Sequence, residues 1–307
     1  MQFGVHLPHI GLDATAANVA RMARKSEELG YESLWVSDHV ALPQRIESAY
    51  PYAPDHELPV GRSMGWLDPI QTLTFAAACT EKVRLGVSVL VMAMRQPVWN
   101  AKQLITLDVL SQGRFILGVG VGWMKEEFDV LEMPWDHRGQ RVDEQLEMFR
   151  TLFREQRPEH HGRFYDFEPI GFNPKPLHGR IPIWVGGHSA PAYRRAAVYG
   201  DDFHAVALHS SPAQVQQQWH AVQRDCEAID RDPASITLSL RASLRYGQHG
   251  LDDGSLHGSD DQLVDTIAAW QEIGVSHIAM NIVVNGNVEQ QLEDVAAFAG
   301  NVRPQLR

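Results

Sequence analysis

The pair Asp38-His39 places two reactive side chains directly after the apolar segment Ser33–Ser37. An imidazole can give or take a proton near neutral pH, so this motif predicts a base or a proton donor at the end of a strand. A histidine at a strand end is often a packing residue, and that interpretation stays open for His39 on this motif alone.

A second motif, Gly186-Gly187-His188-Ser189, precedes a helical stretch. The N-terminus of a helix carries a partial positive charge and free backbone N–H groups, so these residues could hold a phosphate. The same four residues could also be a glycine turn in which Ser189 caps the helix. Both interpretations fit the motif taken by itself.

The segment Gly118–Gly122 alternates glycine with valine at the end of an apolar run. A dinucleotide fingerprint would need a further glycine where Trp123 stands, which disfavours that interpretation. Two interpretations remain: the glycines serve tight packing, or Gly120 and Gly122 let a ligand approach the backbone.

Metal chemistry is disfavoured by the spacing of His6 and His9, because residues three apart on a strand face opposite sides. The two cysteines, Cys79 and Cys226, lie in no motif and are expected to be buried thiols in a reducing compartment. The net charge of -11 argues against a nucleic-acid partner. The N-terminus resembles no signal peptide and no apolar run would span a membrane, so we expect a cytoplasmic protein that is not bound to a membrane.

Eight apolar segments alternate with helical patterns along the chain, which predicts one (β/α)8 TIM barrel over residues 1–307. A doubly wound open sheet is the alternative. The predicted strands are Phe3–Leu7, Ser33–Ser37, Val83–Met92, Arg114–Val121, Ile181–Val185, Asp202–Ala207, Ile236–Leu244 and His277–Ile282.

The active site of such a barrel lies at the C-terminal ends of its strands, where the motifs above would meet. We expect His39, Ser88, Gly120 and Gly187 to open onto one cavity. Two longer segments, Val40–Trp66 and His160–Arg180, are expected to shape that cavity because long loops of compact domains are often binding loops.

Several motifs in this order and spacing resemble the bacterial luciferase-like superfamily of TIM barrels. The likeness covers nearly the whole chain and looks closest to the oxidoreductases that use the deazaflavin coenzyme F420. The FMN-dependent monooxygenases are the sister branch. The motifs are Ser37-Asp38-His39-Val40, Arg84–Leu90, Arg95-Gln96-Pro97, Leu107–Arg114, Gly118–Trp123 and Pro182–Gly187.

The resemblance implies a cofactor ring against the third strand, where the family has a cis non-prolyl bond that we place at Ser88-Val89. It implies that Asp38 and His39 lie beside the ring and that Gly186 and Gly187 approach the phosphate. With the adjoining His188 and Ser189, these residues are our predicted cofactor site. Arg114, Arg141 and Glu144 match family positions that we interpret as structural.

The sequence departs from the family's sugar-phosphate dehydrogenases at Trp123, where those enzymes have a glutamate. Trp123 suggests a more apolar substrate wall, and no basic cluster stands out for the acidic tail of F420. We expect F420-dependent hydride transfer to or from a small-molecule substrate, with His39 and Asp38 as catalytic residues, by a homodimer. An FMN-dependent monooxygenase and a non-catalytic flavin-binding protein are the alternatives.

Overall fold

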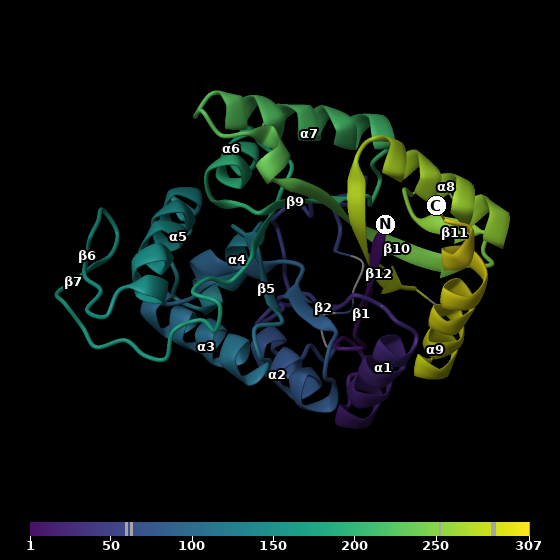
Figure 1. Ribbon diagram of the computed structural model, residues 1–307, viewed down its shortest axis with the longest axis horizontal. Coiled ribbons are helices and arrows are strands. Elements are labelled where there is room, and N and C mark those ends of the chain that lie inside the picture. Colours follow the sequence, from purple (N-terminus) through teal and green to yellow (C-terminus); the bar gives the residue numbers. More distant parts are fainter. Residues whose placement is uncertain (59–60, 62–63, 252, 284–286, 307) are drawn as a thin grey trace.

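A closed barrel of parallel strands forms the centre of the molecule (Figure 1). The computed structural model describes residues 1–58, 61, 64–251, 253–283 and 287–306. Neighbouring strands pair in parallel around the ring, and pairing of the strand that begins at Asp202 with the one that begins at Thr237 closes it. The predicted TIM barrel is confirmed, and the open sheet is excluded by this closure. The barrel strands are β1 (Gln2–His6), β2 (Ser33–Val36), β3 (Arg84–Val87), β5 (Phe115–Gly120), β8 (Ile183–Gly186), β9 (Asp202–Val206), β10 (Thr237–Tyr246) and β12 (Val275–Ile282).

Helices surround this ring of strands (Figure 1), and several begin at side-chain caps. The Asp68 carboxylate accepts the Gln71 N–H at the start of one helix, and Ser211 and Gln214 form a capping box at another. In the described residues no helix is long and apolar enough to cross a membrane. The helices are α1 (Ala16–Glu28), α2 (Pro69–Cys79), α3 (Pro97–Leu110), α4 (Lys125–Val130), α5 (Arg138–Arg154), α6 (Ala190–Tyr199), α7 (Pro212–Glu227), α8 (Asp260–Glu272) and α9 (Val288–Ala297).

The strand predicted over Val83–Met92 is not continuous. After β3 the chain makes a cis peptide bond between Ser88 and Val89, which confirms the predicted position of that bond. The strand resumes as β4 (Leu90–Val91), which pairs with β5, and then turns into a short 3-10 helix, Met92–Met94. The third strand therefore bulges at Ser88 and Val89.

The segment His160–Arg180 lies away from the cavity, so the prediction that it shapes the mouth of the barrel is wrong. It begins with a small hairpin, β6 (His160–His161) and β7 (Asp166–Phe167), which projects outside the ring beyond α5 (Figure 1). Glu144 of α5 binds this segment through the backbone N–H groups of Phe164 and Tyr165. The segment connects the end of α5 to the start of β8, so it runs along the outside of the barrel. A further short strand, β11 (Leu256–Gly258), extends the sheet beside β10 and was not predicted.

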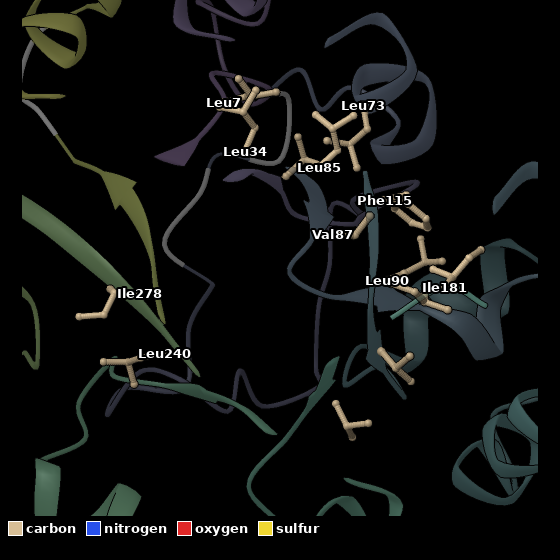
Figure 2. Packing of buried hydrophobic residues seen from close by; sticks show 14 of the residues in the cluster. Leu7, Leu34, Leu73, Leu85, Val87, Leu90, Phe115, Ile181, Leu240 and Ile278 are labelled. Carbon is tan, nitrogen blue, oxygen red and sulfur yellow. The ribbon is translucent and has the colours of Figure 1, made fainter. Parts of the chain in front are cut away.

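Side chains alternate along the strands between the barrel interior and the surrounding helices. Leu34 and Leu85 point outward and lie with Leu73 of α2 in the apolar layer between strands and helices (Figure 2). Trp35 points inward and fills the lower part of the barrel, toward the N-terminal ends of the strands. A Cβ atom at Gly86 would lie 2.2 Å from the Trp35 ring, so glycine makes room for this side chain. The upper part of the interior is left open.

Candidate active site

A cavity of about 600 Å³ lies at the C-terminal ends of the strands, which is the size of many small-molecule sites. The prediction that His39, Ser88, Gly120 and Gly187 open onto one cavity is confirmed. The other predicted site residues also line it, namely Asp38, Val89, Gly122, Gly186, His188 and Ser189. The barrel thus brings together four segments that are far apart in sequence; the roles of these residues remain predictions.

His39 is held in the cavity wall by a carboxylate that the sequence did not reveal. Its Nδ1 lies 2.7 Å from Oε2 of Glu127, a side chain that is only 2% exposed. The other carboxylate oxygen accepts the backbone N–H groups of Val40 and Ala41 at 2.6 and 3.1 Å. With Glu127 ionised, His39 Nδ1 carries the proton and Nε2 is free to accept one. This arrangement is that of an oriented acid–base group.

Asp38 points away from His39 and is fully engaged inside the protein. Its two oxygens accept hydrogen bonds from both terminal nitrogens of Arg95 at 2.7 Å, and one of them also accepts the Val91 N–H at 2.8 Å. The Asp38 side chain is 0% exposed. A bidentate pair of this kind fixes geometry. The carboxylate therefore joins the end of β2 to the segment after the Ser88 bulge, and this geometry favours a positioning role over proton transfer.

The glycines of the cavity floor leave room for the side chain of Val89. A Cβ atom at Gly120 would lie 2.5 Å from Cγ2 of Val89, and one at Gly186 would lie 3.0 Å from Cγ1. Val89 therefore lies in a hollow that only glycines on β5 and β8 can provide. Packing around Val89 is thus one reason for these glycines.

The N-terminus of α6 forms one side of the cavity. Gly187 has a φ of +132° and opens the turn before the helix, a conformation that favours glycine. Ser189 occupies the N-cap position, but its side chain makes no capping hydrogen bond. Its hydroxyl and the helix terminus are therefore available to a phosphate, and the interpretation of Ser189 as a side-chain cap is wrong.

Three arginines from distant parts of the chain line the cavity, although no basic cluster stands out in the sequence. Arg195 is paired with Asp143 at 2.6 Å, and Arg138 donates to the carbonyl of Gly122 at 3.2 Å. Arg241, on β10, has no carboxylate partner among the described residues. It donates to the Ser88 carbonyl at 2.8 Å and to the Ser37 hydroxyl at 3.1 Å. Burial lowers the pKa of this guanidinium.

The long loop predicted over Val40–Trp66 does reach the cavity; its residues 59–60 and 62–63 lie outside the described part of the chain. Tyr50 packs edge-on against Trp123 at 5.1 Å, and Trp66 packs edge-on against His39 at 4.7 Å. Burial raises the pKa of Tyr52 to about 12, so its phenol stays protonated at neutral pH. These rings give the cavity a largely aromatic wall.

The two histidines that raised the question of a metal are not arranged as ligands. His9 Nδ1 lies 2.8 Å from the Leu7 carbonyl, and His9 Nε2 accepts the Ser37 N–H at 2.8 Å. Both nitrogens of this ring are therefore occupied. Within the residues that the structure describes, no group of three or more His, Cys, Asp or Glu side chains could hold a metal ion.

Sequence reasoning missed Glu127, Arg95 and Arg241 as parts of the site. Arg95 belonged to a motif that carried the resemblance, but nothing local indicated that it pairs with Asp38. Glu127 begins no recognisable motif, and Arg241 lies in a strand with ordinary alternation. Each becomes visible only when the strands that carry their partners come together.

This chain is similar to several known proteins over most of its length. A family model described as luciferase-like monooxygenase matches residues 1–249. An uncharacterized protein of Mycobacterium tuberculosis is 30% identical over 307 residues, which cover 100% of this chain and 99% of that protein. An F420-dependent glucose-6-phosphate dehydrogenase of Intrasporangium calvum is 26% identical over 331 aligned positions, which cover 92% of each chain.

Solved structures share the fold at lower identity. A monooxygenase from Streptomyces bottropensis superposes with a TM-score of 0.82 at 21% identity and covers 99% of each chain. The coenzyme F420-dependent tetrahydromethanopterin reductase of Methanopyrus kandleri superposes with a TM-score of 0.78 at 16% identity, over 100% of this chain and 99% of that one.

Proposed function

We propose a function from the premise that this chain belongs to the luciferase-like monooxygenase family: it is an F420-dependent oxidoreductase that transfers a hydride between the deazaflavin and a small organic substrate. The observation that carries the proposal is the His39–Glu127 pair, which faces a cavity floored by Ser88 and Val89. An acid–base group beside a ring site is what hydride transfer to or from a carbon–oxygen bond requires.

The residues present fit such a cofactor. Val89 and the glycines around it offer apolar cavity surface for a ring, and the N-terminus of α6 with the uncapped Ser189 suits a phosphate. When bound, the deazaflavin supplies the hydride chemistry. The protein's part is to orient the ring, to exclude water with the aromatic wall, and to hold or move a proton at His39 Nε2.

The wall and Arg241 together indicate the class of substrate. Tyr50, Trp66 and Trp123 offer apolar surface. By the family resemblance, Trp123 takes the place of the glutamate of the sugar-phosphate dehydrogenases. Arg241 is a half-buried cation whose hydrogen-bond acceptors among the described residues are neutral oxygens, so an acceptor oxygen of a ligand would gain from its charge. We infer a largely apolar substrate that bears a carbonyl or hydroxyl group.

A titration of the apoprotein with F420 and with FMN, followed by fluorescence at one salt concentration, tests the cofactor. The F420-dependent relatives, at 26% identity, favour tighter binding of F420. The alternative is an FMN-dependent monooxygenase, which the fold shared with a monooxygenase keeps open. Equal or tighter binding of FMN would select that alternative. The salt must be held fixed because the tail of F420 is charged.

A storage protein for flavin is the remaining alternative, and the cavity argues against it. A second hollow of about 270 Å³ adjoins the first and shares Tyr52 and His188 with it, so there is room for a substrate beside a cofactor.

The predicted homodimer would use an exposed apolar face. Phe75 of α2 and Trp99 of α3 are 41% and 67% exposed, and burial of such rings favours association.

A further inference from the structure

We propose that four buried side chains relay protons through the barrel interior, from the floor of the cavity to the opposite end of the barrel. The relay consists of Ser88, His204, Ser239 and Asp202. The inference rests on the proposed function, because hydride transfer in either direction leaves a proton to be delivered or removed.

The four side chains form one unbroken chain of hydrogen bonds. Ser88 Oγ lies 2.8 Å from His204 Nε2, and His204 Nδ1 lies 2.7 Å from Ser239 Oγ. Ser239 in turn donates to Oδ1 of Asp202. Each of the four residues is at most 1% exposed, so the chain is shielded from bulk water along its length.

The strand pattern explains why the chain crosses the barrel. Asp202 and His204 are two apart on β9 and both point inward, and Ser239 is aligned with His204 on the neighbouring strand β10. Ser88 and His204 line the cavity at one end. At the other end, Thr237 donates to Asp202 Oδ2 at 2.6 Å, and Thr237 is exposed at the start of β10. One hydrogen bond therefore separates Asp202 from the surface.

The chain has two complete hydrogen-bonding arrangements, which differ by one proton. With Asp202 ionised, Ser239 donates to Asp202, His204 donates through Nδ1 to Ser239, and Ser88 donates to Nε2. With Asp202 protonated, every donor is reversed: Asp202 donates to Ser239, Ser239 to Nδ1, and Nε2–H to Ser88. The Ser88 O–H then points to the cavity.

One concerted shift converts the second arrangement into the first. A ligand group that accepts a hydrogen bond from Ser88, here called the seated group, takes the hydroxyl proton. Ser88 then takes the proton from His204 Nε2. His204 Nδ1 takes the proton of Ser239, which takes that of Asp202. The net result is one proton moved from Asp202 to the seated group, with the imidazole neutral before and after. The reverse shift carries a proton out of the cavity.

The surroundings suit these roles. Burial raises the pKa of Asp202 to about 8, against the weaker lowering effects of its Ser239 and Thr237 hydrogen bonds and of Arg84. Asp201 also faces this carboxyl and raises its pKa. Asp202 can therefore hold a proton at neutral pH and release it.

His204 is kept neutral and fixed in orientation. Burial, and to a lesser extent the charge of Arg241, lower its pKa to about 3. The Trp35 ring stacks on the imidazole at 5.4 Å with an angle of 13° between the planes. His204 can therefore accept a proton at one ring nitrogen while it donates one from the other, and it stays neutral at neutral pH. The relay reaches the cavity at its floor, whereas the His39–Glu127 pair reaches it at the wall.

A neighbouring cluster provides the matched control. Ser33 Oγ lies 2.7 Å from His277 Nε2 and accepts the Trp35 indole N–H at 2.7 Å, but none of these hydrogen bonds leads to the cavity. Ser33 and Ser239 are both buried on inward faces of barrel strands. The same serine-to-alanine change at each position therefore separates loss of the relay from loss of a buried hydroxyl.

The first measurement needs no cofactor. NMR of the apoprotein with isotope-labelled histidine, with His204 assigned by its absence from His204→Gln, reports which ring nitrogen carries the proton. We expect a change from Nε2–H to Nδ1–H as the pH rises through about 8. The change should be lost in Ser239→Ala and in the isosteric Asp202→Asn, and kept in Ser33→Ala. A single tautomer over this range, or a change that survives in Ser239→Ala, would overturn the relay.

The second measurement is the rate of hydride transfer in the reconstituted enzyme across the same pH range. Ser239→Ala should slow it roughly 10²-fold, the lower end of what a positioned acid–base group contributes, while Ser33→Ala retains the wild-type rate. A Ser239→Ala enzyme as fast as wild type would show that the chain does not serve the reaction. If the wild-type protein binds neither F420 nor FMN, the proposed function fails. The tautomer measurement still decides whether the protons of Asp202, Ser239 and His204 shift together.

Discussion

Replacement of Glu127 by glutamine tests the proposed acid–base pair with the least disturbance of its surroundings. The glutamine carbonyl can keep the hydrogen bonds from the backbone N–H groups of Val40 and Ala41. Its amide then faces His39 Nδ1 across the present 2.7 Å contact, so Nδ1 must accept and the proton moves to Nε2. The ring nitrogen that faces the cavity can then no longer take a proton.

The expected loss follows from what positioned acid–base catalysis contributes. Turnover of bound cofactor should fall about 10²- to 10⁴-fold, roughly 3–5 kcal/mol of barrier, while cofactor affinity changes little. His39→Ala should lose a similar factor. The double variant should lose no more than His39→Ala alone, because Glu127 acts through His39.

The matched control is Glu126→Gln. Glu126 lies on the same helix and binds the same loop, through the N–H groups of Glu47 and Ser48 at 2.7 and 2.9 Å, but it does not contact His39. Single-turnover rates, cofactor affinities and circular dichroism should be measured on one set of preparations. If Glu127→Gln and Glu126→Gln turn over equally fast, His39 is a packing residue and the proton comes from another group.

Three further substitutions test other parts of the structure. Asp38→Asn leaves the buried Arg95 without its counter-charge and should lower the free energy of unfolding by about 3–5 kcal/mol in denaturant melts; a loss below about 1 kcal/mol would contradict the pairing. Gly120→Ala should displace Val89 and weaken cofactor binding in the same fluorescence titration, and unchanged affinity would mean that the floor is not the ring site. The native pKa of Asp202, about 8, lies above its unfolded value, so the unfolding free energy should fall by up to about 1.4 kcal/mol per pH unit as the pH rises from 6.5 to 8. Below pH 6.5 the lowered pKa of His204 gives a slope of the opposite sign, so the measurement is made above it. Asp202→Asn should flatten this slope, and an unchanged slope would contradict the assignment.

The cavity and the relay occupy different parts of the barrel interior and meet at Ser88 and His204. The upper part holds the cavity, while the lower part is filled by Trp35, Trp184 and the buried histidines. Polar side chains at such depth are normally paired, and the pairing of His204 with Ser239 and Ser88 satisfies this rule. In this arrangement the same hydrogen bonds that stabilise the barrel can also move a proton across it.

The amino-acid sequence by itself determined the barrel and the end of the barrel that carries the cavity. Alternating apolar and helical periodicity is a local property, so the eight strands could be predicted directly from it. The resemblance of the motif around Ser88 and Val89 to the family's third strand predicted the cis bond, and the order of the motifs indicated the family.

The tertiary structure decided which side chains meet. Glu127 reaches His39 across 88 positions, and Asp38 binds Arg95 across 57, so no local pattern could show either pair. The relay joins Ser88 to His204 across 116 positions for the same reason. Barrel closure aligns strands from the two halves of the chain, and only in that alignment do isolated polar residues become connected hydrogen-bonded groups.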